Sequence, residues 1–188
     1  MTAIESMPTR ALDIDTLVAR ARDGDIRAYE QLVLHCQMQM FGLATKMLAD
    51  RGEAEDVVQE VFLTAWRRLG QLDDDAAFVG WLYRMTINRC LNVLRARRPR
   101  VDVDFDTAES ARTDIRPEVA VQVHSQLEAL NTALLGLTPE QRACWLLREL
   151  HGLTYEEIAA IVGVGGTAVR GRIARARAQL AEVMKPWR

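Results

Sequence analysis

Arginine side chains crowd the last third of the sequence. Between residues 166 and 180 there are four arginines and no acidic residue: Arg170, Arg172, Arg175 and Arg177. Helical spacing predicts one apolar stripe, comprising Val169, Ile173, Ala176, Leu180, Val183 and Met184. On the opposite side lie only small residues, Gly171, Ala174 and Ala178. Small side chains let a helix approach a DNA groove closely, while flanking guanidinium groups bind phosphates or guanine edges. We therefore predict that this helix contacts DNA.

The residues before this helix carry the signals of two further helices. Thr-Pro-Glu-Gln at 138–141 and Thr-Tyr-Glu-Glu at 154–157 both have the composition of a helix N-terminal capping box. Within the second of these units, Ala159, Gly163 and Val169 follow one another at offsets of four and six. A small residue, a turn residue and an apolar residue at this spacing are typical of a helix-turn-helix. A solvated basic helix would explain the arginines but not this spacing.

The rest of the chain has helical periodicity as well. Apolar spacing predicts helices at about 15–22, 26–48, 53–69 and 78–97, and a second helical set over 117–184. Between 102 and 118, six acidic residues stand against two arginines, with little apolar periodicity. The sequence therefore predicts an all-α protein of two small helical domains joined by a flexible linker. The predicted boundaries are a tail at 1–12, a first domain at 13–98, an acidic linker at 99–117 and a second domain at 118–188.

The predicted helix at 53–69 has an unusual outward face. If its valines face the core, the outward patch consists of Asp56, Gln59, Glu60 and Leu63. An exposed leucine among acidic residues is more typical of a protein-docking face than of a solvated one. An ordinary surface helix is the alternative.

The predicted helix at 78–97 combines aromatic, amide and arginine side chains without any acid. Its candidate binding residues are Trp81, Tyr83, Arg84, Asn88, Asn92 and Arg95. Aromatic rings interleaved with arginine and asparagine suit unstacked bases and a single-stranded backbone. The alternative is that Trp81 and Tyr83 are simply core aromatics.

Nothing in the sequence indicates catalysis or a bound cofactor. The three histidines (His35, His124 and His151) and three cysteines (Cys36, Cys90 and Cys144) have neither metal-ligand nor nucleophile spacing. The sequence lacks a phosphate-binding loop with its lysine, a signal core and a membrane-spanning apolar run. We therefore expect a cytoplasmic protein that is not an enzyme and needs no metal or cofactor.

Two sets of motifs resemble the bacterial σ factors. Asp-Val-Val-Gln-Glu at 56–60, with Trp-Leu-Tyr-Arg at 81–84, is similar to σ region 2. Leu-Thr-Pro-Glu-Gln-Arg at 137–142, with the motifs at 152–159 and 169–177, is similar to σ region 4. Two such regions joined by a short linker, with nothing else, resemble the extracytoplasmic-function (ECF) group of the σ70 superfamily.

The resemblance implies a division of labour among these surfaces. Asp56, Gln59, Glu60 and Leu63 would dock on the β′ clamp helices of core RNA polymerase, and the second domain would also sit on the β flap. The helix carrying Trp81 and Asn88 would recognise and help melt the −10 promoter element. The −35 element would be read by Thr167, Arg170, Gly171, Arg172, Ala174 and Arg175. Such factors are typically held inactive by an anti-σ partner.

Two other classes of protein remain open from the sequence. A stand-alone helix-turn-helix repressor or activator would bind its operator without polymerase, usually as a dimer on paired half-sites. An interaction adaptor would have kept the fold and lost the DNA function. Only a σ factor predicts promoter-dependent RNA synthesis when core polymerase is added.

Overall fold

A computed structural model describes residues 13–97 and 129–185. The predicted tail, the predicted acidic linker and His124 therefore lie outside the described residues. Within the described ranges every regular element is a helix, as predicted. The order is α1 (Ile14–Arg22), α2 (Ile26–Leu48), α3 (Arg51–Arg68), the short 3-10 helices η1 (Leu69–Gln71) and η2 (Asp75–Ala77), α4 (Phe78–Arg97), α6 (Pro139–Glu149), α7 (Tyr155–Val162) and α8 (Gly166–Val183). Residues 129–135 are also helical and lead into α6.

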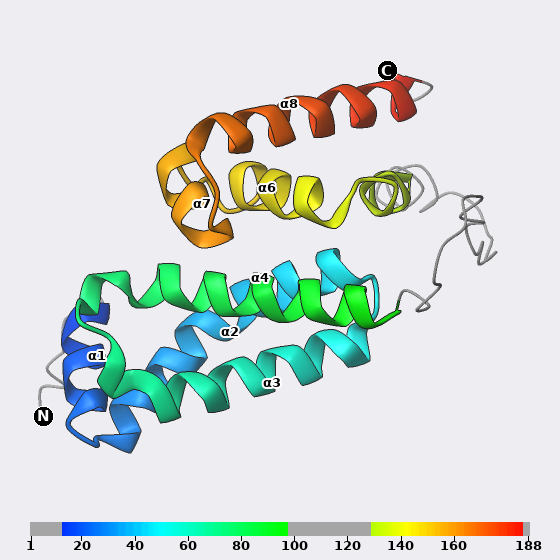
Figure 1. Ribbon diagram of the computed structural model, residues 1–188. Coiled ribbons are helices and arrows are strands. Elements are labelled where there is room, and N and C mark those ends of the chain that lie inside the picture. The colour runs from blue at the N-terminus through cyan, green and yellow to red at the C-terminus, as the bar shows by residue number, and fades with distance from the viewer. Residues whose placement is uncertain (1–12, 98–128, 186–188) are drawn as a thin grey trace, which may run out of the picture.

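The first four helices form a bundle around an apolar core (Figure 1). Asp25 begins α2 by accepting hydrogen bonds from the backbone N–H groups of Arg27 and Ala28. Asp50 begins α3 in the same way, through the N–H of Glu53. The valines expected to face inward on α3 are buried, so the outward patch predicted from them is indeed exposed.

The last three helices form the predicted helix-turn-helix. Both capping boxes are present: Thr138 with Gln141 at the start of α6, and Thr154 with Glu157 at the start of α7. Gly163 ends α7 with a positive φ of 69°, a conformation that favours glycine. This turn directs the chain into α8, which packs on α6 and α7.

The apolar stripe of α8 is buried from Val169 to Leu180, as predicted. The prediction was wrong for Val183, which is 48% exposed, and Met184 is only partly buried. Both residues lie at the C-terminal end of the helix, since Val183 is the last residue of α8 and Met184 is its cap.

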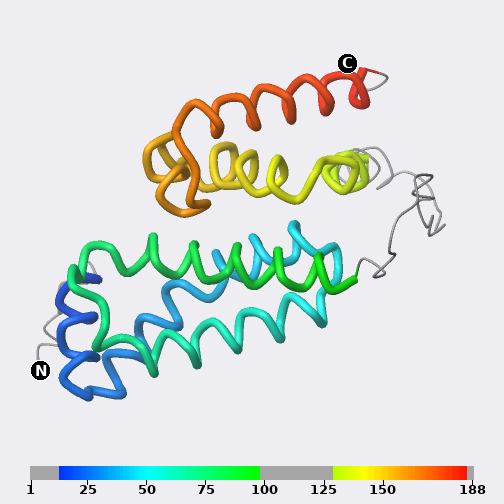
Figure 2. Tube along the Cα trace, viewed as in Figure 1, coloured from blue at the N-terminus to red at the C-terminus, as the bar shows by residue number. Residues whose placement is uncertain are grey.

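The two halves of the chain pack against each other. In Figures 1 and 2, α6 and α7 lie over the α2 and α4 side of the first bundle. The element contacts agree, since α7 packs on α4, and α6 packs on both α2 and α4. The buried residues of both halves belong to one continuous apolar cluster.

Candidate nucleic-acid interface

The α8 helix presents a basic surface on the side away from its buried stripe. Thr167, Arg170, Ala174 and Arg175 are exposed, and Gly171 is half-buried. At Gly171 an added Cβ would lie 3.5 Å from the nearest Arg175 nitrogen, which is ordinary contact distance. The Arg170 guanidinium lies 5.8 Å from the centre of the Tyr155 ring on α7. The small residues and the outward arginines therefore lie on one face, as the spacing predicts.

The remaining two arginines of α8 are turned toward α6. Arg177 donates two hydrogen bonds to the Glu149 carboxylate, at 3.0 and 2.6 Å, and this interaction raises the pKa of Arg177. Arg172 is half-buried and interacts with the Cys144 thiol on α6. Arg172, a predicted DNA contact, thus has an intramolecular partner, whereas Arg170 and Arg175 keep the more exposed positions.

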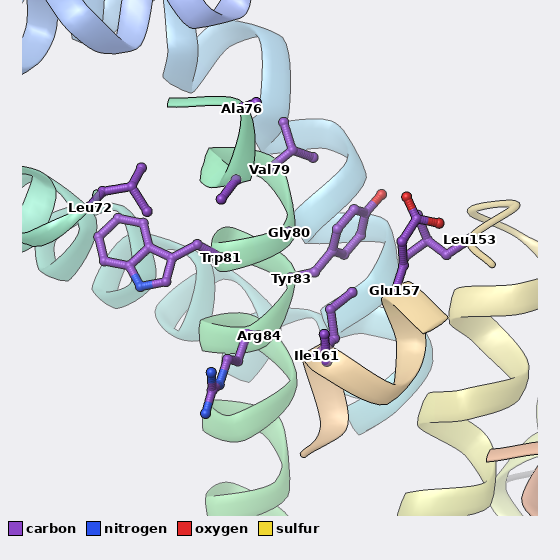
Figure 3. Close-up of a pocket in the computed structure, with 12 residues that line it drawn as sticks. Leu72, Ala76, Val79, Gly80, Trp81, Tyr83, Arg84, Leu153, Glu157 and Ile161 are labelled. Atoms are coloured by element: carbon purple, nitrogen blue, oxygen red, sulfur yellow. The ribbon is translucent and has the colours of Figure 1, made fainter. Parts of the chain in front are cut away.

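The predicted binding residues of α4 do not share one environment. Arg84, Asn88, Asn92 and Arg95 are exposed, and Arg95 donates a 2.6 Å hydrogen bond to the Asn92 side chain. Tyr83 is only 4% exposed because it faces the second half of the chain. Figure 3 shows Tyr83 pointing toward Leu153 and Glu157, while Trp81 and Arg84 point to another side of α4.

A polar groove runs between α3 and α4. It is lined by Glu60, Val61, Thr64, Arg68, Met85, Asn88, Arg89 and Asn92. The groove brings together Asn88 and Asn92, as the sequence predicts, with two arginines that the sequence analysis did not select. Spacing indicates Arg68, because Thr64 and Arg68 lie four residues apart on α3 and share a face, as Asn88 and Asn92 do on α4. No such spacing indicates Arg89, which directly follows Asn88.

Glu60 lies in this polar groove. Its carboxylate pairs with Arg89 of α4 at 2.6 Å, across the groove from its own helix. The sequence grouped Glu60 with the docking residues of α3, yet its side chain lies among the predicted −10 residues. A pairing between two helices was not readable from either helix alone.

An apolar groove lies on another side of α3, against α2. It is lined by Ile26, Tyr29, Val33, Gln37, Val58, Gln59, Phe62, Leu63 and Trp66. Ile26 is 69% exposed and Leu63 is 59% exposed. The Tyr29 hydroxyl donates a 2.5 Å hydrogen bond to the Phe62 carbonyl, and its ring lies 4.8 Å from that of Trp66. Two predicted docking residues, Gln59 and Leu63, therefore lie in an apolar groove whose α2 wall the sequence analysis missed.

The thiols and imidazoles form no reactive constellation in the described ranges. Cys36, Cys90 and Cys144 are all buried and free of disulfides. Burial raises the pKa of Cys36 to about 11 and that of Cys90 to about 12, so both stay protonated at neutral pH. No metal-type cluster of His, Cys, Asp or Glu occurs among residues 13–97 and 129–185. Nor is any helix in those ranges long and apolar enough to cross a membrane.

These surfaces define an all-helical DNA-binding protein with a helix-turn-helix in its second half. Comparison with known proteins agrees with that class. Residues 32–100 match the family model of sigma-70 region 2, and residues 127–180 match that of sigma-70 region 4. The chain belongs to the sigma-70 family, whose members are transcription initiation factors.

The relatives are of the ECF type and align over almost the whole chain. The RNA polymerase sigma-H factor of Pseudomonas aeruginosa is 37% identical over 179 residues, covering 90% of this chain and 93% of that protein. The ECF RNA polymerase sigma-E factor of Escherichia coli K12 is 35% identical, with the same coverage. A solved structure of CnrH in complex with the cytosolic domain of CnrY has a TM-score of 0.71 and 28% identity, covering 92% of this chain and 97% of CnrH.

Proposed function

We propose that this σ factor uses three separate surfaces to direct core RNA polymerase to promoters. The apolar groove between α2 and α3 binds the β′ clamp helices. The exposed residues of α4 and the polar groove beside them capture the −10 element during melting. The outward face of α8 reads the −35 element, and the second domain also sits on the β flap.

The observation that carries this proposal is the separation of the three surfaces. Leu63 and Gln59 lie in the apolar groove, whereas Asn88 and Asn92 lie in the polar groove on the other side of α3. An apolar groove with exposed anchors suits a protein partner, since interface cores are apolar and poor in charge. Amides and arginines beside an aromatic helix suit single-stranded DNA. One chain can therefore hold polymerase and DNA at the same time.

The −35 assignment rests on the helix-turn-helix and on its outward arginines. In such folds the second helix enters the major groove, with its N-terminal residues toward the base edges. Thr167, Arg170, Gly171 and Ala174 occupy that half of α8, and Arg175 follows on the same face. Arg172 contributes less in this assignment, because it is half-buried, whereas Arg170 and Arg175 are exposed.

We further propose that an anti-σ protein controls this factor, and that the factor works in the cytoplasm with its polymerase. Exposed apolar side chains of the groove would be covered when either partner binds. A partner that occupies the same groove as the polymerase would keep the factor inactive. CnrH, a structural relative, has been solved with a bound protein partner, the cytosolic domain of CnrY.

Titration of labelled protein with purified core polymerase tests the docking surface. Leu63→Asp places a charge in the apolar groove and should weaken binding by about tenfold or more, since truncated or charged hot-spot anchors cost on the order of 2 kcal/mol. Leu34→Asp is the matched control, because Leu34 is similarly exposed, at 62%, but does not line the groove. Equal affinities for the two variants would remove the groove from the docking site, and no binding by the unmodified chain would favour a stand-alone regulator.

A further inference from the structure

The polar groove between α3 and α4 holds an arginine that already has an acidic partner. Arg89 of α4 pairs with the Glu60 carboxylate of α3 at 2.6 Å, and the two side chains are 43% and 51% exposed. Water therefore reaches this ion pair, and an exposed pair contributes little to stability. A phosphate group, which a guanidinium binds through two charge-assisted hydrogen bonds, can replace the carboxylate.

A second ion pair between the same two helices is held more firmly. Arg97, at the end of α4, pairs with Glu53 of α3 and also donates a 3.0 Å hydrogen bond to the Leu48 carbonyl of α2. Partners on two other helices fix this guanidinium as part of the fold. Within residues 13–97 and 129–185, by contrast, the carboxylate partner of Arg89 is Glu60 alone. Of these two arginines, Arg89 is therefore the one that can turn to a ligand.

The polar groove has the shape of a track along α4, which lies beside α3 in the bundle (Figure 1). A neighbouring cavity shares Arg89 and Asn92 with the groove and extends as far as Ala96 and Arg97. From Asn88 to Ala96 a helix rises about 12 Å. That length matches about three stacked nucleotides at about 3.4 Å each. The track is therefore long enough for several phosphates of one strand.

The charges that line the polar groove nearly balance. Its two arginines, Arg68 and Arg89, and its one carboxylate, Glu60, leave a net charge of +1. Without the carboxylate the groove would carry a charge of +2 and would attract any polyanion, whatever its sequence. Phosphate contacts carry no sequence information, whereas contacts to base edges do. A carboxylate that weakens the phosphate contacts therefore increases the share of the affinity that depends on the bases.

We propose that Arg68 and Arg89 bind the backbone phosphates of the single strand whose bases α4 captures, and that Glu60 restrains Arg89 until a phosphate replaces it. A strand then binds well only where base contacts, such as those of Asn88 and Asn92, add to the phosphate contacts. Glu60 is in this way a specificity-determining residue. The inference rests on the proposed role of α4 in −10 capture, so its test follows the charge exchange apart from promoter recognition.

Binding of a labelled, mixed-sequence, single-stranded oligonucleotide to the full chain, measured over a range of salt concentrations, tests the exchange. Each phosphate contact adds about 0.7 to the slope of log affinity against log salt. Arg68→Ala and Arg89→Ala should each weaken binding and reduce this slope by about 0.7. Glu60→Gln should raise the affinity by about twofold to fivefold, because Arg89 no longer has to leave an exposed ion pair. The same variant should steepen the slope.

The Arg51–Glu55 pair of α3 provides matched controls. It is also exposed, with a separation of 3.1 Å, and neither residue lines the polar groove or the neighbouring cavity. Arg51→Ala and Glu55→Gln make the same changes of charge on the same helix. At about 0.15 M salt, where exposed charges beyond about 8 Å are screened, both should leave the affinity and the slope unchanged.

The steeper slope of Glu60→Gln should depend on Arg89 and disappear when Arg89→Ala is added. The same steepening with and without Arg89, or equal effects of Glu60→Gln and Glu55→Gln, would overturn the exchange. No binding by Glu60→Gln, even at low salt, would overturn the phosphate contact of Arg89. Promoter-dependent transcription with core polymerase tests the proposed function separately. If transcription is present and these salt slopes do not differ, this inference fails and the proposed function stands.

Discussion

At the scale of single residues, the four arginines of α8 differ in their partners within the protein. Arg177 forms an ion pair with Glu149 at the end of α6, and Arg172 is half-buried beside the Cys144 thiol of α6. Arg170 and Arg175 lie on the exposed face beside Gly171 and Ala174. The four arginines of one helix thus divide into two with partners on α6 and two on the outward face, where we propose that they contact the −35 element.

This difference predicts a large and a small loss of promoter affinity for two alanine substitutions on α8. Arg175→Ala should cost about 1–3 kcal/mol of binding to a promoter with its own −35 element, if the guanidinium contacts a base edge. Arg177→Ala should change that affinity much less, because the side chain is engaged with Glu149. Competition titrations of holoenzyme on duplexes with intact and scrambled −35 elements measure both. An equal loss for Arg175→Ala on the two duplexes would assign it to a phosphate instead.

At the scale of the elements, short-range signals in the sequence placed most helices and turns. Capping boxes at Thr138 and Thr154 form as predicted, since both depend only on residues three apart. The predicted helix at 53–69 is α3 with its boundary moved: it begins at Arg51, behind the Asp50 cap, and η1 takes over at Leu69. Local chemistry thus predicted the elements and their exposed faces.

The Thr154 cap also predicts a stability effect. Thr154→Ala removes an oxygen that accepts from the Glu157 N–H at the start of α7, and should cost about 1 kcal/mol of unfolding free energy. Urea unfolding followed by circular dichroism measures the change. Thr167→Ala is the matched control, because Thr167 is exposed in the first turn of α8 and should change stability by less than about 0.5 kcal/mol. Equal losses of unfolding free energy for the two variants would show that the Thr154 cap stabilises the protein no more than an exposed threonine does.

At the scale of the whole molecule, pairings between distant elements were not predictable from spacing. The Glu60–Arg89 ion pair joins α3 to α4 and places Glu60 in the polar groove. The Tyr83–His151 contact joins residues 68 positions apart, and it buries a side chain that the pattern of α4 placed among the DNA contacts. Periodicity reports which face of a helix is apolar, but it does not report which other helix covers that face. The exposed faces of single helices were therefore predictable from the sequence, whereas the contacts between helices were not.

For the molecule as a whole, we propose that this chain supplies promoter specificity to core RNA polymerase. Transcription in vitro from pooled genomic fragments, with purified core polymerase and the unmodified chain, tests it most directly. We expect discrete transcripts that are absent with core enzyme alone, and that are lost with Leu63→Asp but kept with Leu34→Asp. Identical transcripts with and without the chain, or protection of DNA sites by the chain in the absence of polymerase, would contradict it.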